Sequence, residues 1–277
     1  MQQATYQNCK ICNATISDFQ PQFELVKCTS CGFIFYKHQL DSAYVQSLYN
    51  KLYNQQDDYL LYKQQAAILQ QGKQPHLGYN KQKILNELLS KQCKSIVEIG
   101  AGVGIVGHYL QRKRLNYHGI ELDAQAAKLA QSASVNITNT TFRSLADFTS
   151  LDAVIAFEVL EHIDDLKECL ELIHQCLKPD GYIGLSVPNF KNFYNLSSLQ
   201  QQTNLGQVGP PVHINFFTVE SLQVILRKFH FKPVYLQPRP FPTFIWNKKA
   251  TYKKLWRSFN GKYEGSTLLC IAKKEDI

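Results

Sequence analysis

The 277-residue chain has no apolar run that could cross a membrane, since a spanning helix needs about 20 consecutive apolar residues. Its first residues, Met-Gln-Gln-Ala-Thr-Tyr-Gln, also lack the basic and apolar segments of a secretory signal peptide. We therefore expect a cytoplasmic protein. Hydrophobic residues nevertheless make up 44% of the chain, which is enough for a buried core and excludes a disordered or fibrous protein.

Acidic residues are fewer than basic ones. The chain has 22 Asp and Glu against 30 Lys and Arg, for a formal net charge of +8. Much of this imbalance is local, because the interval between Glu220 and Glu264 holds ten Lys and Arg and no acidic residue. The surplus indicates an anionic partner, whose class the charge alone does not determine.

An insertion at residues 238–261 mixes several of these cations with aromatic side chains. Apolar residues recur there with the spacing of an amphipathic helix, at Tyr252, Leu255, Trp256 and Phe259. The helix could pack on its own domain with a solvated basic face, clamp a substrate phosphate, lie on anionic lipid through residues 241–259, or bind nucleic acid. Because the surplus charge is concentrated in and around one insertion, we expect a localised anionic handle or surface more than general nucleic-acid affinity.

The eight cysteines fall into two groups. One group consists of two C-x-x-C pairs near the start of the chain, at Cys9, Cys12, Cys28 and Cys31. Each pair puts two thiolates on one tight turn, and two turns complete a tetrahedral shell, so the spacing predicts a closed structural Zn²⁺ site in a ribbon at residues 1–36. The remaining cysteines lie in or beside apolar runs and are expected to pack in the core: Cys93, Cys169, Cys176 and Cys270.

The hydrophobic pattern changes twice after the ribbon. Residues 37–80 are rich in Gln and Tyr and have few apolar side chains, so we expect a linker and helical cap that packs on the C-terminal domain. Over residues 81–277, helices alternate with short apolar strands, the third of which is expected at 136–142, and this is the pattern of a parallel sheet covered on both faces. The last two strands, at 232–237 and 267–273, are separated by the basic insertion and not by a helix of the regular alternation, which implies an antiparallel edge.

A glycine-rich loop at residues 100–104 connects a strand at 95–99 to a helix. Its glycines allow a tight turn and the close approach of a ligand to backbone amides at the helix N-terminus. Glu98 precedes the loop, where a carboxylate would accept a ligand ammonium but repel the pyrophosphate of a dinucleotide. Glu121, at the end of the next strand, is placed to accept both hydroxyls of a ribose.

Five motifs occur in an order that indicates a family. They are Val97-Glu-Ile-Gly-Ala-Gly-Val-Gly104, Gly119-Ile-Glu-Leu-Asp123, Phe157-Glu-Val-Leu-Glu-His162, Leu177-Lys-Pro-Asp-Gly181 and Ser186-Val-Pro-Asn189. From about residue 81 to 273 the chain resembles the class I S-adenosylmethionine-dependent methyltransferases. The resemblance implies an α/β, Rossmann-like, doubly wound sheet of seven strands with an antiparallel last strand. With its N-terminal cysteine pairs and segment 210–218, the chain is most similar to bacterial methyltransferases that tailor sugars and natural products.

The resemblance also implies roles for individual residues. The residues expected to bind S-adenosylmethionine are Glu98, Gly100, Gly102, Gly104, Glu121, Leu122, Ser144, Leu145 and Phe157. Glu98 and the three glycines would hold the methionine part of the cofactor, and Glu121 would hold the ribose. The adenine would be contacted by Leu122, Ser144 and Leu145. Phe157 and the adjacent Glu158 would lie beside the sulfonium.

A sugar hydroxyl is a poor nucleophile, so its methylation requires a base. His213 and His162 are the candidates, because imidazole titrates near neutral pH and both fall where strand ends should converge. His162 could instead cap the following helix or hold the loop, and His213 could be a surface residue. Glu158 and Glu161 could orient the histidines or bind a divalent ion, although the sequence alone predicts no catalytic metal cluster.

We therefore expect an S-adenosylmethionine-dependent methyltransferase that acts on a glycan precursor, a nucleotide sugar or a similar small metabolite with an anionic handle. One alternative is an RNA methyltransferase that grips RNA through the ribbon and the basic insertion, which requires salt-dependent binding. Another is a non-catalytic scaffold of the same fold, which would have no need of the glycine loop together with Glu98 and Glu121.

Overall fold

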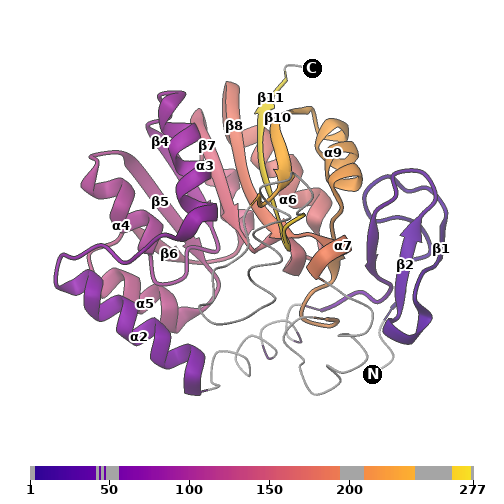
Figure 1. Cartoon of the computed structure of the whole chain (residues 1–277), viewed down its shortest axis with the longest axis horizontal. Coiled ribbons are helices and arrows are strands. Elements are labelled where there is room, and N and C mark those ends of the chain that lie inside the picture. The colour runs from indigo at the N-terminus through magenta and orange to yellow at the C-terminus, as the bar shows by residue number, and fades with distance from the viewer. Residues whose placement is uncertain are drawn as a thin grey trace.

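The computed structural model describes residues 4–41, 44, 47, 56–193, 209–240 and 264–275. A large mixed sheet carries helices on both faces, and a small antiparallel sheet lies at one side of it (Figure 1). Residues 241–261 of the basic insertion, with the expected helix and the candidate membrane contact, lie outside the described residues, as do residues 48–55 of the expected linker. Within the described ranges, no helix is both long and apolar enough to cross a membrane.

The large sheet has seven strands in the order β10-β11-β8-β7-β4-β5-β6. Neighbours are parallel from β8 through β6, whereas β11 is antiparallel to both β8 and β10. The predicted doubly wound sheet with an antiparallel last strand is thereby confirmed. Its strands are β4 (Ser95–Ile99), β5 (Asn116–Glu121), β6 (Ile137–Asn139), β7 (Leu151–Phe157), β8 (Leu177–Pro188), β10 (Phe231–Pro238) and β11 (Thr267–Lys274).

Two groups of helices cover the two faces, because successive strand side chains point to opposite sides. In β7, Val154 and Ala156 join a hydrophobic cluster with α6 and α9, and Ala153 and Ile155 join the opposite cluster with α3 and α4. The helices are α2 (Gln56–Gln70), α3 (Gly78–Ser90), α4 (Ile105–Arg112), α5 (Ala124–Ser132), α6 (Leu166–Cys176), α7 (Phe190–Phe193) and α9 (Val219–Lys228).

The third strand of the sheet is shorter than predicted. A strand was expected over 136–142, but β6 ends at Asn139 and a 3-10 helix, η2 (Phe142–Asp147), comes next. The hydroxyl of Thr141 accepts a hydrogen bond from the backbone N–H of Arg143 and so caps this helix. A local side-chain bond therefore starts a short helix directly after the strand, and Leu145 of this helix packs in the core.

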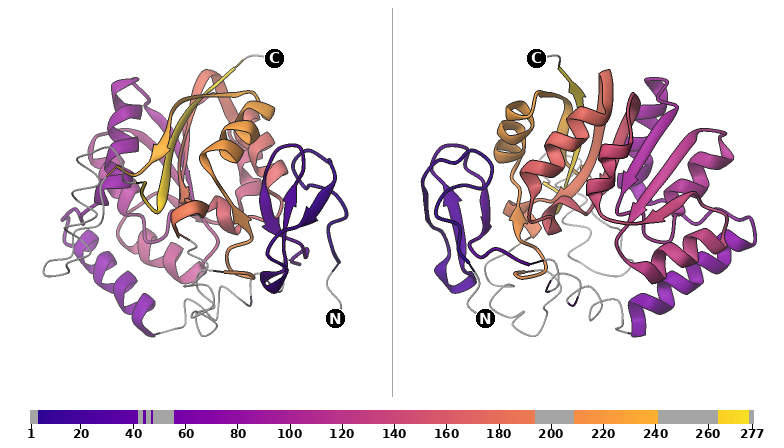
Figure 2. Two further views of the ribbon diagram at one scale, coloured as in Figure 1. Left: turned by 45° about the vertical axis from the view of Figure 1, so that its right-hand side comes forward. Right: turned by 180° about the vertical axis from the view of Figure 1, so that it is seen from behind.

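The N-terminal ribbon is joined to the large domain by main-chain pairing. Its strands β1 (Ile16–Asp18), β2 (Leu25–Cys28) and β3 (Ile34–Tyr36) are extended by β9 (Asn215–Phe216), which comes from the segment after β8. Strand β3 pairs with β9 through Ile34 opposite Phe216 and Phe35 opposite Asn215. Figure 2 shows the ribbon, in indigo, beside α9 in both views.

The ribbon also shares the domain's core. Phe33 and Phe35 are fully buried, their rings stack with centroids 5.4 Å apart, and Phe33 also meets Phe217 at 5.7 Å. The same hydrophobic cluster continues into α6 and α9. Because this apolar surface is buried jointly, we infer that the ribbon and the large domain stabilise one another.

Candidate functional site

The glycine loop bridges the carboxyl end of β4 and the start of α4. Gly100 has φ 71° and Gly104 φ 81°, in the left-handed region that side chains with a Cβ rarely adopt. A Cβ at Gly100 would lie 2.4 Å from Val159 Cγ2, and one at Gly104 would lie 2.8 Å from Val135 Cγ1. Only glycine therefore fits these two positions without a shift of the neighbouring chain.

Two buried carboxylates flank this loop. Glu98, at the end of β4, is 2% exposed and accepts a hydrogen bond from the Tyr117 hydroxyl at 2.6 Å. Burial raises the pKa of Glu98 to about 7, against the opposing charge of Lys81. Glu121, at the end of β5, accepts the backbone N–H groups of Gly102 at 2.7 Å and Asp123 at 2.8 Å. The fold thus gathers Glu98, Glu121 and the glycines at one end of the parallel strands.

The other residues expected to bind the cofactor differ in the solvent exposure of their side chains. Leu122 and Ser144 are partly exposed, and the Ser144 hydroxyl donates to the carbonyl of Thr141 at 3.0 Å. Leu145 is 0% exposed and belongs to the hydrophobic cluster beneath α6. Its side chain therefore packs in the core, and its expected contact with adenine could come only from its backbone.

Lys81 is a residue that the sequence reasoning missed. It lies on α3, and its Nζ is 5.7 Å from the ring centroid of Phe157, at the end of β7. Its charge opposes the burial that raises the pKa of Glu98. The lysine precedes the glycine loop on a separate helix, so no motif in the sequence marked it.

The histidine pair comes together at the neighbouring strand ends. His162 ends the short 3-10 helix η3 (Leu160–His162), His213 lies just before β9, and their ring centroids are 4.7 Å apart at an interplanar angle of 79°. His213 is 8% exposed, which excludes a surface role. The residue at the N-cap of α6 is Asp165, so His162 is not its cap. Burial lowers the pKa values of His162 to about 4 and of His213 to about 3.

Two glutamates lie beside these histidines. Glu158 is exposed, has φ 56°, and its backbone N–H donates to the Ser186 carbonyl at 2.8 Å. Glu161, by contrast, is 1% exposed, and its Oε1 lies 3.9 Å from Nε2 of His162. Burial, followed by the charge of Glu158, raises the pKa of Glu161 well above its ordinary value. The predicted catalytic residues His213, His162 and Glu158 therefore share one region with Glu161, which is the buried one of the two glutamates.

Backbone contacts hold the two histidine-bearing segments together. The Asn215 side-chain amide donates to the carbonyl oxygens of Leu160 at 2.7 Å and Ile163 at 2.6 Å. The N–H of Ile214 donates to the Glu161 carbonyl at 2.8 Å. Asn215 lies in segment 210–218, which the sequence analysis named. Its hydrogen bonds to the carbonyls of Leu160 and Ile163 are visible only in the folded structure.

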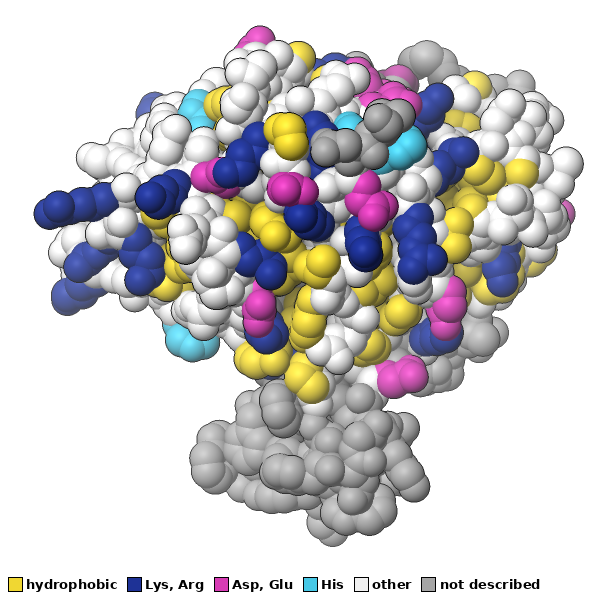
Figure 3. Space-filling model, turned by 90° about the horizontal axis from the view of Figure 1, so that it is seen from above, with side chains coloured by type: hydrophobic (Ala, Val, Ile, Leu, Met, Phe, Trp, Pro, Cys, Tyr) yellow, Lys and Arg dark blue, Asp and Glu magenta, His cyan; other side chains and the backbone are white. Residues whose placement is uncertain are grey.

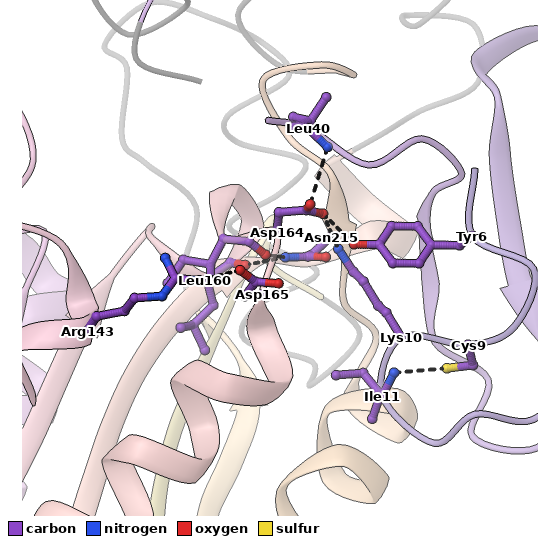
Figure 4. Close-up of polar contacts among 11 residues, drawn as sticks. Tyr6, Cys9, Lys10, Ile11, Leu40, Arg143, Leu160, Asp164, Asp165 and Asn215 are labelled. Atoms are coloured by element: carbon purple, nitrogen blue, oxygen red, sulfur yellow. Dashed lines mark hydrogen bonds and ion pairs between the residues drawn. The ribbon is translucent and has the colours of Figure 1, made fainter. Parts of the chain in front are cut away.

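The loop after η3 also anchors the ribbon. Asp164 accepts hydrogen bonds from the Tyr6 hydroxyl at 2.8 Å and the Leu40 N–H at 3.2 Å, and it pairs with Lys10 Nζ at 3.3 Å. Figure 4 shows Tyr6 and Lys10 pointing from the ribbon toward this carboxylate. Burial lowers the pKa of Lys10, and Asp164 opposes that shift. The ribbon is therefore docked through a buried charge next to the histidine pair.

The four N-terminal cysteines converge as predicted. The sulfur atoms of Cys9, Cys12, Cys28 and Cys31 all lie within 4.8 Å of one another. Backbone N–H groups point at the sulfurs, from Ile11 to Cys9 at 3.5 Å and from Cys31 to Cys28 at 3.4 Å, an arrangement that favours thiolates. The donor set therefore fits a tetrahedral zinc ion. The other cysteines are buried in the core, as expected: Cys93, Cys169, Cys176 and Cys270.

Comparisons with known proteins agree with this architecture. The profile of the methyltransferase domain family matches residues 74–236, more than half of the chain. A ubiquinone biosynthesis O-methyltransferase of Cupriavidus pinatubonensis is 29% identical over 104 residues, which are 35% of this chain and 42% of the relative. The chain thus spans less than half of that relative's length.

Solved structures are similar in fold. A SAM-dependent methyltransferase from Archaeoglobus fulgidus matches with a TM-score of 0.52 at 17% identity, over 78% of this chain and 99% of the other. A SAM-dependent methyltransferase of Thermotoga maritima, described as a possible histamine N-methyltransferase, matches with a TM-score of 0.51 at 18% identity, over 83% and 100% of the two chains. With its seven-stranded sheet and glycine loop, the chain belongs to the methyltransferase domain family and has the class I S-adenosylmethionine-dependent methyltransferase fold.

Proposed function

We propose that the protein transfers the methyl group of S-adenosylmethionine to an oxygen of a small-molecule acceptor. The observation that carries this proposal is the grouping of Glu98, Glu121 and the glycine loop at the same strand ends as the histidine pair. S-adenosylmethionine supplies an electrophilic methyl group on a positively charged sulfur. A transfer of this kind requires mainly that the acceptor be aligned and water excluded.

The residues on the cofactor side suit the parts of that molecule. Glu98 would accept its ammonium group, Lys81 would pair with its carboxylate, and Glu121 would accept the ribose hydroxyls. Gly102, where an added Cβ would meet no atom within 4 Å, leaves room for the ligand beside the backbone of the loop. Leu122, Ser144 and Phe157 would complete the contacts with adenine and sulfonium.

On the acceptor side, His213 and His162 would act on the acceptor hydroxyl, with Glu158 at the open edge of the site. We propose a glycan precursor, nucleotide sugar or similar metabolite with an anionic handle as the acceptor. The likeness to a ubiquinone biosynthesis O-methyltransferase supports methylation of an oxygen on a small molecule. The eight free cysteines fit a reducing cytoplasm.

We further propose that the ribbon carries one structural Zn²⁺ and forms a wall of the acceptor site. Its Lys10 points inward to Asp164, and its strand β3 pairs with β9, two residues after His213. Both features suit a positioning role more than a nucleic-acid grip. Figure 3 shows the end of the molecule where β11 finishes, away from the carboxyl ends of the parallel strands, and basic side chains are interspersed with acidic ones there.

The acceptor is tested by a methyl-transfer screen with labelled S-adenosylmethionine against nucleotide sugars, lipid-linked sugars and RNA. We expect transfer to a sugar or related metabolite, abolished by His213→Ala while cofactor affinity stays nearly unchanged. The matched control is His174→Ala, which alters a histidine beside His230 at the far end of α6. Transfer to RNA with steep salt dependence would instead favour the RNA methyltransferase, and absence of cofactor binding the scaffold.

The zinc site is tested by native mass spectrometry of the full chain. We expect the combined Cys28→Ser and Cys31→Ser variant to lose the ribbon's zinc ion, whereas Cys169→Ser, in the core, should retain it. Retention of that zinc by the double variant would contradict the four-thiolate site.

A further inference from the structure

We propose that Glu161, His162 and His213 bind a divalent transition-metal ion, at a site separate from the four cysteines. One carboxylate oxygen and one nitrogen from each imidazole lie within 4.8 Å of one another, a spacing that a single ion can bridge. The ligands come from two segments about 50 residues apart, η3 and the residue before β9.

The strongest reason is the state of the Glu161 carboxylate. It is 1% exposed, and neither of its oxygens has a hydrogen-bond partner within the described part of the chain. The nearest ring nitrogen of His162 is 3.9 Å from Oε1, beyond hydrogen-bonding distance. Since buried carboxylates are paired or bind metals, an ion between Glu161 and the imidazoles would supply the missing partner.

His162 is oriented as a metal ligand. Its Nδ1 lies 2.8 Å from the carbonyl oxygen of Val212, and because a carbonyl only accepts, Nδ1 must carry the proton. The lone pair is then on Nε2, which is the nitrogen nearer Glu161. Metal-bound histidines commonly donate their second ring N–H to a backbone carbonyl in this way, which sets the tautomer and the ring orientation.

The surrounding backbone holds the three ligands in place. Ile214 N–H donates to the Glu161 carbonyl at 2.8 Å, and Asn215 bonds the carbonyls on both sides of the Glu161–His162 pair. The N–H of Tyr36 in the ribbon donates to the Ile214 carbonyl at 2.9 Å. Ligands fixed by such contacts lose little freedom on binding, which favours a preformed site.

The donor set limits the kind of ion. Two imidazoles and one carboxylate suit zinc or another late first-row divalent metal better than magnesium or calcium, which prefer oxygen ligands. Three protein ligands leave a coordination position open, as in catalytic and not in structural zinc sites. The four-thiolate ribbon site, by contrast, is closed.

The chemical role of this ion in methyl transfer rests on the proposed function. An acceptor hydroxyl at the open position would be made more acidic by the metal and lose its proton to Glu158 or water. The oxygen would then form its bond to the methyl carbon as the carbon–sulfur bond breaks, leaving a neutral thioether. His162 and His213 would act through the ion and not as free bases.

The experiment counts zinc ions per chain by native mass spectrometry after Zn²⁺ is added to the full-length protein and weakly bound metal is removed. We expect two ions in the wild type and one in Glu161→Gln and in His213→Ala. The nearly isosteric Glu161→Gln is the deciding variant if His213→Ala does not fold. The matched control, His174→Ala with His230→Ala, removes a histidine pair with a 5.8 Å ring separation and should keep two ions.

Two results would overturn the proposal. A single zinc in the wild type would mean that Glu161 is a buried neutral acid. A second zinc retained by Glu161→Gln would mean an adventitious ion only. The cofactor affinity of each variant, measured by calorimetry, should be unchanged. The metal-site proposal and the proposed methyltransferase function can therefore fail independently of one another.

Discussion

Replacing Glu98 by Gln should change how the stability of the protein depends on pH. Glu98 is buried at the end of β4, and burial raises its pKa to about 7 from an ordinary value of 4.5. At 1.36 kcal/mol for each pH unit of difference, ionising Glu98 in the folded state costs about 3 kcal/mol more than in the unfolded chain. Glutamine is nearly isosteric, cannot ionise, and can still accept the Tyr117 hydroxyl.

The sign of the change in stability depends on whether the folded or the unfolded chain holds the proton on Glu98. Below pH 4.5 both states are protonated, and between 4.5 and about 7 only the folded state is, so wild-type stability falls as pH rises through this window. The Glu98→Gln protein lacks this contribution. Relative to the wild type it should therefore gain about 3 kcal/mol between pH 4.5 and 7.5.

Urea unfolding at several pH values between 4.5 and 8 measures this difference directly. The control is Glu87→Gln on α3, because Lys83 lowers the pKa of Glu87 and any effect should be small and of opposite sign. Parallel stability curves for wild type and Glu98→Gln would refute the reasoning, since they would show that Glu98 is already ionised at low pH. If Glu98 accepts the cofactor's ammonium, wild-type affinity should also fall about 100-fold from pH 8 to pH 5.

Two further substitutions probe the docking of the ribbon and the glycine loop. Asp164→Ala leaves Lys10 buried without its carboxylate and should cost about 3 kcal/mol in urea unfolding, whereas Asp165→Ala, at an exposed ion pair, should cost less than about 1 kcal/mol. Equal losses would contradict the buried-anchor reasoning. Gly104→Ala should destabilise the fold by about 1 kcal/mol or more and weaken cofactor binding. The control Gly209→Ala, whose added Cβ would meet no atom within 4 Å, should do neither. A Gly104→Ala protein as stable as the wild type would count against the strained turn.

The elements that the sequence predicted well are those set by neighbours along the chain. The strand at Ser95–Ile99 and the helix starting at Ile105 occur as expected, because alternating apolar residues and a glycine turn act locally. The strand expected to run to Phe142 failed because the Thr141 side chain caps a short helix there. The burial of the Leu145 side chain was not predictable from the sequence, because burial depends on what packs over a residue.

The sequence by itself determined the alternation of strands and helices, the glycine loop and the four-cysteine cluster, since periodicity and short spacings encode local geometry. The seven-stranded methyltransferase fold followed from the resemblance of its motifs to a known family. Only the tertiary structure decided that β9 joins the ribbon sheet, that Lys81 faces Phe157, and that Glu161 lies buried beside two histidines. Those contacts join residues far apart in the chain. Their existence depends on how strand ends and loops meet in space, which no local pattern specifies.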